Sequence, residues 1–205
     1  STTNLPTSRP TPHADAGMTQ SLAGWTGLPL GADGFLTLSG EYVTRHATNR
    51  SDFANAAALP AYGRPIVLGR FGDPEVKSYT AYANAGLPLN EAWSAYGYGG
   101  YQRRDSSAAA TARAYNNANN VPAIYPGGFL PFIETEIEDW TLAGGVKGEI
   151  AGFKVDVGAS YGRNDLRYDV TNSLNATFGA ASQTSFFAGT LGYNQWLAGV
   201  DAARR

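Results

Sequence analysis

Residues 140–161 read WTLAGGVKGEIAGFKVDVGASY, and the two alternating runs in this stretch decide the predicted fold. In each run every second residue is apolar, aromatic or glycine, while the residues between are small, polar or charged. A period of two predicts β-strands, because successive side chains of a strand point to opposite faces. Ala151-Gly152 predicts a two-residue hairpin turn, since such turns need positive φ angles. Each run also has about the 9–11 residues with which a tilted strand crosses a bilayer, so the stretch is typical of a membrane β-barrel hairpin.

The same alternation predicts further strands on both sides of this hairpin. Residues 17–45 predict a second hairpin around the turn GADG at 31–34. Alternation returns within 75–87, and WSAYGYGGYQRR follows at 93–104 with glycines that obscure its phase. The last strand is expected from Phe187 to Asp201. We therefore count about seven strand candidates.

The connections between these strands alternate between short and long. The short ones lie near residues 29–34, 88–91 and 151–152, and the long ones span 46–74, 104–139 and 163–184. Outer-membrane barrels have short periplasmic turns and long extracellular loops. The predicted fold is therefore all-β, an antiparallel transmembrane β-barrel segment over residues 17–205, and the Pro- and Thr-rich residues 1–16 are expected to form an extended linker.

Composition excludes several classes of function. Only 16% of the 205 residues are charged and the net charge is −2, so nothing indicates the phosphate neutralisation on which nucleic-acid binding depends. Cysteine is absent and only two histidines occur, which argues against thiolate metal sites and histidine-based catalysis. We expect no enzyme activity, no cofactor and no metal site.

Three stretches carry a family resemblance: YPGGFLPFIETEIEDW at 125–140, GFKVDVGASYGRND at 152–165 and NSLNATFGAASQTSF at 172–186. They resemble the barrel of proteobacterial TonB-dependent outer-membrane receptors. Gln183 stands where an SPTSF-like stretch has proline, and Thr177 where the family has serine. The likeness extends over residues 17–201 and is concentrated in 34–50 and 120–201.

The resemblance implies a 22-stranded barrel with a plug domain inside it, located in the cell outer membrane. About seven strands cannot close such a barrel, so the chain is expected to be one piece of its wall. The implied partners are outer-membrane lipid, the remaining strands and plug of the same receptor, and the TonB complex. The implied function is energy-coupled import of a scarce nutrient: a siderophore, a cobalamin-like compound or an oligosaccharide.

Aromatic residues near strand ends are expected to form the girdles that mark a membrane interface. These are Trp25, Tyr42, Trp93, Trp140 and Tyr161. Aromatic, amide and basic residues of the long loop 104–139 and its start are instead candidates for ligand binding, because exterior loops carry function. These are Arg103, Arg104, Tyr115, Asn119, Tyr125 and Phe129.

Some alternatives stay open from the sequence alone. The acidic run from Glu134 to Asp139 is interpreted as a solvated strand extension, with a calcium-binding loop as the alternative. Lys147, Glu149, Lys154 and Asp156 are expected on the lumen face near the periplasmic rim. The alternative functions are a small passive or structural outer-membrane barrel and a secreted, soluble carbohydrate-binding β-sandwich.

Overall fold

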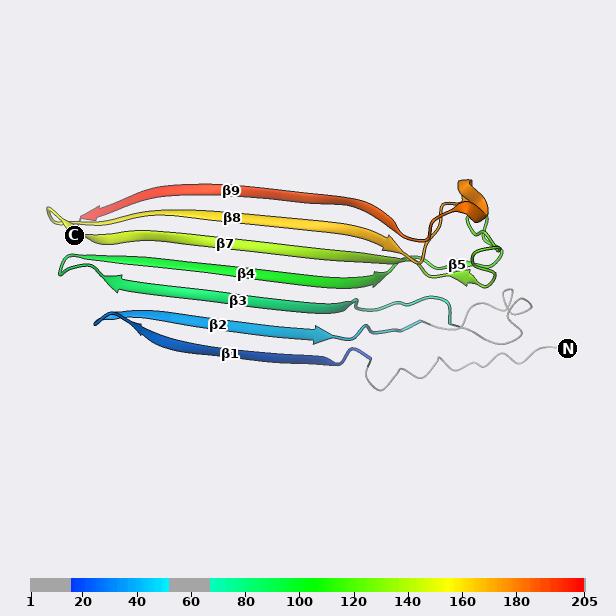
Figure 1. The fold of residues 1–205 in the computed structure, drawn as a ribbon, viewed down its shortest axis with the longest axis horizontal. Helices are drawn as coiled ribbons and strands as arrows, with labels where there is room; N and C mark the ends of the chain where they lie inside the picture. The colour runs from blue at the N-terminus through cyan, green and yellow to red at the C-terminus, as the bar shows by residue number, and fades with distance from the viewer. Residues whose placement is uncertain (1–15, 52–66, 205) are drawn as a thin grey trace.

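The computed structural model describes residues 16–51 and 67–204, which form one layer of antiparallel strands (Figure 1). Seven strands pair in the order β1-β2-β3-β4-β7-β8-β9, and a separate two-stranded ribbon, β5-β6, lies in a loop. The main strands are β1 (Thr19–Leu30), β2 (Gly34–Arg45), β3 (Glu75–Pro88), β4 (Trp93–Ala109), β7 (Phe132–Ile150), β8 (Phe153–Thr171) and β9 (Phe186–Arg204). The predicted all-β, seven-stranded antiparallel architecture is confirmed. The predicted linker lies outside the described residues but for its last residue, 16.

Short turns join the strands at one end of the sheet, and the long connections lie at the other (Figure 1). The predicted turn at Ala151-Gly152 is confirmed, with φ angles of 52° and 74°. Both angles are positive, as a type I′ hairpin turn requires. In the turn between β3 and β4, the Asn90 side chain accepts hydrogen bonds from the backbone N–H groups of Ala92 and Trp93, at 2.9 and 3.0 Å.

The long connections are shorter than predicted, because the strands continue through their charged ends. The predicted loop 104–139 shrinks to residues 110–131, and the loop 163–184 becomes 172–185. The first holds the ribbon of β5 (Arg113–Ala114) and β6 (Gly128–Phe129), which the sequence did not predict, and the second holds the 3-10 helix η2 (Ala176–Ala181). Part of the predicted loop 46–74 lies outside the described residues.

Cross-strand register gives the sheet two chemically distinct faces. Directly opposed residues of antiparallel strands point to the same side, so the pairs Leu142↔Tyr161 and Lys147↔Asp156 identify the two faces of β7 and β8. We call them the Leu142 face and the Lys147 face. From the short turns to the middle of the sheet, the Leu142 face carries mostly leucine, valine, alanine and glycine, and the Lys147 face carries mostly small and polar residues.

The sheet has almost no hydrophobic core of its own. In the described ranges, the one buried hydrophobic side chain is Phe129, which lies in a loop. Large apolar side chains on the Leu142 face are instead exposed, among them Leu142 at 63%, Val200 at 70% and Leu22 at 75%. A continuous exposed apolar surface of this kind needs another apolar phase or a partner to cover it.

A bulge interrupts the alternation in β9. Asp169 pairs with Phe187 and Tyr168 with Gly189, so Ala188 has no opposite residue. Phe187 therefore lies on the Leu142 face, where the Arg167 guanidinium sits 5.1 Å above its ring, and Leu191 lies on the other face. Strict alternation, which would place Phe187 and Leu191 together, is wrong across this bulge.

Candidate membrane-facing surface and ligand loops

Three aromatic pairs cross the Leu142 face between neighbouring strands. Tyr42 and Tyr79 have ring centroids 5.0 Å apart, Tyr101 and Trp140 4.5 Å, and Tyr161 and Trp196 4.7 Å. Each pair joins directly opposed residues of adjacent strands. Together the pairs bridge β2 to β3, β4 to β7 and β8 to β9.

Of the five residues predicted for the girdle, four lie on the Leu142 face. Tyr42, Trp140 and Tyr161 belong to the three pairs, and Trp93 lies at the opposite end of the face, next to the short turns. Trp25 was placed wrongly: it pairs with Ser39 on the Lys147 face and is 80% exposed. Sequence reasoning missed Tyr79, Tyr101 and Trp196, because only register shows which aromatic residues are opposed.

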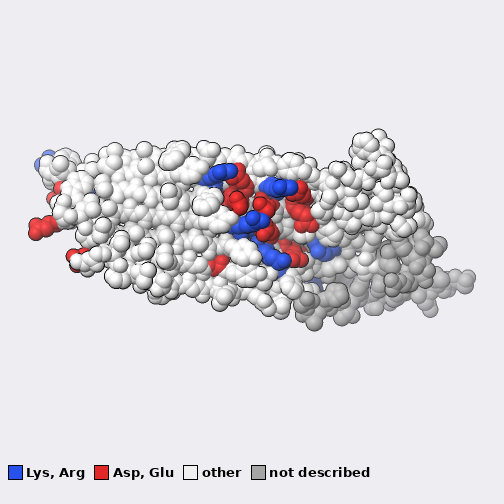
Figure 2. Space-filling model, viewed as in Figure 1, with Lys and Arg blue, Asp and Glu red and all other residues white. Residues whose placement is uncertain are grey.

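Charged residues gather on the Leu142 face beyond the aromatic pairs, toward the long loops (Figure 2). We call this group the ionic band. Its members are Glu75, Lys77, Arg103, Asp105, Glu134, Glu136, Glu138, Arg163, Asp165, Arg167 and Asp169. Between the band and the short turns, Figure 2 shows almost no charged side chains on this face.

Ion pairs connect the ionic band within and between strands. The Arg103 guanidinium lies 2.5 Å from a carboxylate oxygen of Glu136 and 3.3 Å from one of Asp105. Arg167 lies 2.6 Å from Asp169, and its hydrogen bonds hold the pKa of that carboxyl group below the usual value. The acidic run is therefore a strand paired with arginines, as the solvated-strand interpretation predicts. No group of three His, Asp or Glu residues in the described part of the chain is arranged to hold a metal ion.

The structure corrects the loop placement of two predicted ligand residues. Arg103 and Arg104 both lie inside β4, and because they are adjacent they point to opposite faces. Arg103 belongs to the ionic band, whereas Arg104 lies on the Lys147 face. They do not form one basic site in a loop.

The other predicted ligand residues lie in the loop 110–131, where two of them build its interior. Tyr125 stacks on Phe129 with ring centroids 4.7 Å apart, and Phe129 is only 5% exposed. Burial raises the pKa of Tyr125, against the opposing effect of a hydrogen bond with Thr184. The Asn120 amide donates to the carbonyls of Tyr115 and Tyr125, at 2.9 and 3.0 Å. These contacts show that Tyr125 and Phe129 pack the loop.

Other residues of the loops are exposed instead, among them Asn119 and Phe178. Asn119 lies in a turn, and its backbone N–H donates a hydrogen bond to the side-chain oxygen of Asn117. Phe178 is 66% exposed on η2, whose first turn is capped by Asn175. The two loops also contact each other, since the Asn172 amide donates to the Leu130 carbonyl at 2.8 Å.

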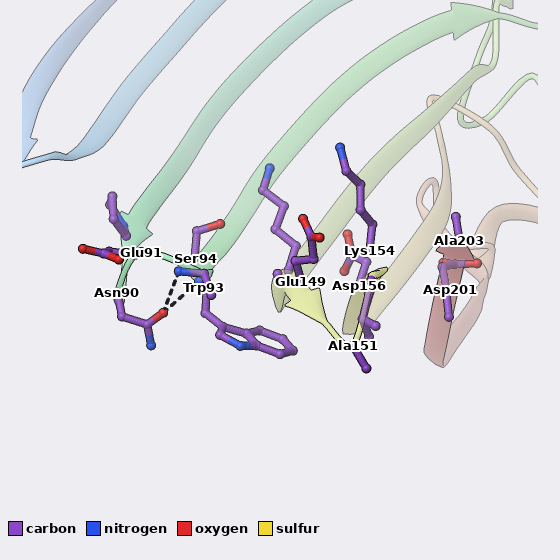
Figure 3. Close-up of a pocket in the computed structure, with 17 residues that line it drawn as sticks. Asn90, Glu91, Trp93, Ser94, Glu149, Ala151, Lys154, Asp156, Asp201 and Ala203 are labelled. Carbon is purple, nitrogen blue, oxygen red and sulfur yellow. Dashed lines mark hydrogen bonds between the residues drawn. The ribbon is translucent and has the colours of Figure 1, made fainter. Parts of the chain in front are cut away.

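The Lys147 face is hollowed near the short turns. A cavity of about 1100 Å³ is lined there by charged side chains from three strands, and Figure 3 shows Glu149 and Lys154 on one side of the sheet and Trp93 on the other. The predicted residues Lys147, Glu149, Lys154 and Asp156 all line it, together with Asp201. Their predicted position near the short turns on one face is confirmed.

Tyr96 lies on this face beside the cavity and connects β4 with β7 and β8. Its hydroxyl donates to Asp156 at 2.8 Å. A Cβ atom on either Gly145 or Gly158 would come within 2.6 Å of the Tyr96 hydroxyl oxygen, so the hydroxyl end of this side chain lies over both glycines. The glycines of β7 and β8 therefore make room for an aromatic side chain of β4.

Comparison with known proteins adds no assignment. Neither a scan of family models nor a search of curated proteins returns a match to this chain. Within the described residues, no helix is long and apolar enough to cross a membrane.

Proposed function

We propose that the chain forms part of the wall of a TonB-dependent outer-membrane receptor that imports a scarce nutrient. The observation that carries the proposal is the apolar part of the Leu142 face, which ends in the aromatic pairs on one side and near Trp93 on the other. A transmembrane barrel has an outward apolar band about 25 Å tall between two aromatic girdles. The assignment to a receptor rests on the sequence resemblance.

The positions of the aromatic pairs support tilted strands. Tyr79 is opposed by Arg103, so the next pair begins two residues closer to the short turns, at Tyr101. Trp140 is opposed by Arg163, and the last pair again begins two residues closer, at Tyr161. A shift of two residues for every two strands corresponds to a tilt of roughly 35°, from a rise of about 3.3 Å and a strand spacing of about 4.8 Å. Barrel strands tilt by about 35–45°.

The height of the apolar part also supports a membrane span. Trp93 and Tyr101 stand eight residues apart on β4, and Trp140 and Ile150 stand ten apart on β7. At about 3.3 Å per residue and this tilt, these spans cover about 22–27 Å along the membrane normal. The strands are longer than the span, and their loop ends carry the ionic band into the polar region.

In this arrangement the Lys147 face lines the lumen and the loops meet the nutrient. We assign the capture of ligand to exposed loop residues such as Asn119 and Phe178, rather than to Phe129, which is buried. The charged cavity near the short turns faces the interior, where a plug would lie. The chain contributes side chains for binding and passage and no catalytic group.

Cysteine labelling tests the proposed topology, because the chain contains no cysteine of its own. In the full receptor without other cysteines, Asn119→Cys is expected to react with a membrane-impermeant maleimide on intact cells. Glu91→Cys, in a short turn, should react only after the outer membrane is opened, and Val157→Cys should stay unlabelled in both cases. Efficient labelling of Val157→Cys in water would contradict a lipid-facing surface and favour a soluble protein.

Uptake measurements test the import function separately. Cells that lack the receptor should lose energy-dependent uptake of one nutrient among ferric siderophores, cobalamin-like compounds and oligosaccharides, and the intact gene should restore it. Uptake that survives removal of the TonB complex would contradict the proposal and favour a passive barrel.

A further inference from the structure

The ionic band consists of rows that cross the strands parallel to the line of the aromatic pairs. On each of β3, β4, β7 and β8, the first two residues beyond the aromatic residue on the Leu142 face are charged. The first row consists of Lys77, Arg103, Glu138 and Arg163. The second row consists of Glu75, Asp105, Glu136 and Asp165. Three of the four first-row residues are cations, whereas all four in the second row are carboxylates.

Each cation of the first row is held by the carboxylate two residues farther out on its own strand. The closest nitrogen–oxygen distances are 3.7 Å from Lys77 to Glu75, 3.3 Å from Arg103 to Asp105 and 2.5 Å from Arg163 to Asp165. The side chains of Lys77 and Arg163 are still 51% and 53% exposed. The pairs therefore orient cations that other groups can reach.

The fourth member of the first row supports the same arrangement. Glu138 accepts a hydrogen bond from the Tyr101 hydroxyl at 2.9 Å and lies 3.7 Å from Arg103. Glu138 thus contacts Tyr101 of an aromatic pair and Arg103 of its own row.

The depth of the first row matches that of lipid phosphates. Two residues beyond the aromatic pairs correspond to about 5 Å along the membrane normal at the tilt derived above. The polar region of a bilayer adds about 5–8 Å to each side of the hydrocarbon core. A row of cations at this depth faces phosphate groups, and the carboxylates of the second row lie farther out, where they disfavour phosphates.

We propose that the first-row cations Lys77 and Arg163, each about half exposed and paired with a single carboxylate, bind the phosphate groups of outer-leaflet lipids and so fix the depth of this part of the wall in the membrane. Arginine and lysine bind phosphates through charge-assisted hydrogen bonds. The inference rests on the proposed function, because it requires the Leu142 face to be covered by lipid.

The test compares the double variant Lys77→Gln/Arg163→Gln with Arg167→Gln in the full receptor. Arg167 is a matched control, since it lies on the same strand and face as Arg163, has the same pairing with a carboxylate two residues on, and is 54% exposed. It lies in a third row, farther from the aromatic pairs. The receptor is placed in neutral phospholipid vesicles, and binding of a spin-labelled phosphorylated glycolipid is compared with binding of the same lipid without phosphate.

We expect the double variant to lose about fivefold in preference for the phosphorylated lipid per cation removed, and Arg167→Gln to lose less than twofold. An equal loss in Arg167→Gln, or an unchanged preference in the double variant, overturns the proposal. The wild-type preference should also weaken as salt is raised, and salt-independent binding would overturn it without any variant. A receptor that does not insert into vesicles at all refutes the proposed function itself, whereas normal insertion without phosphate preference refutes this inference alone.

Discussion

Between the short turns and the aromatic pairs, the Leu142 face carries leucine, valine and alanine, whereas beyond the pairs the same strands carry ion pairs on that face. On β7 and β8 the Lys147 face changes in the opposite sense. It is polar near the short turns, at Lys147 and Asp156, and more apolar near the long loops, at Ile133 and Leu166. The amphipathic pattern therefore inverts within single strands.

This inversion separates two environments along one continuous backbone ladder. In the first part the side chains on the Leu142 face are apolar, as in strands that face lipid, and in the second they are charged, as in strands that face water. The alternation of polar and apolar residues continues along the whole strand. Only the face that carries the apolar residues changes. The boundary lies at the aromatic pairs, whose amphipathic rings belong at an interface.

The largest expected effect comes from placing one charge in each part of the Leu142 face. Val157→Arg, in the middle of the apolar part of β8, should lower the unfolding free energy by about 2–4 kcal/mol. Asn194→Arg, on the same face just beyond Trp196, should cost at most about 1 kcal/mol. Urea unfolding of the full receptor in lipid vesicles measures both, and equal costs would remove the distinction between the two parts.

A second experiment asks whether Gly158 of the Lys147 face makes room for the Tyr96 side chain. Gly158→Ala would place a methyl group against the Tyr96 hydroxyl and should cost about 1–3 kcal/mol. The control is Gly199→Ala, because Gly199 pairs with Gly158 and a methyl group added there would meet open space. If truncation by Tyr96→Ala does not relieve the cost of Gly158→Ala, the glycine has a role other than making room for that ring.

The smallest expected effect lies at the turn where the apolar part of the hairpin ends. Ala151 has a positive φ of 52°, which asparagine adopts more readily than alanine. Ala151→Asn should raise the unfolding free energy by about 0.5 kcal/mol, and Gly152→Ala, at a φ of 74°, should lower it by about 1 kcal/mol. Thermal and urea unfolding measure both, and a loss of stability in Ala151→Asn would contradict the type I′ turn.

The fold was largely predictable because alternation and turn chemistry are local. The hairpin around Ala151-Gly152, the seven strands and the shared face of Trp140 and Tyr161 all follow from residues close in sequence. The loop 104–139 was predicted too long because its charged ends were interpreted without their neighbours. The alternation of glutamate with isoleucine there continues the strand, with the faces exchanged.

The candidate site was less predictable because it depends on register. Trp25 is an aromatic strand residue like the others predicted for the girdle, yet register places it on the Lys147 face. Phe129 has the composition of a ligand contact but fills the interior of its loop. The rows of the ionic band combine residues from four strands, and no local pattern indicates which of them lie side by side.

By itself, the sequence determined the period of two, the positions of the short turns and the chemistry of each strand face, because these depend on neighbours along the chain. Only the tertiary structure decided that Tyr101 meets Trp140, that Tyr96 lies over Gly145 and Gly158, and that cations and carboxylates form separate rows. These features depend on how far each strand is shifted against the next. A shift of one residue would move every side chain to the other face, so the pairing of the strands determines the chemistry of each face of the sheet.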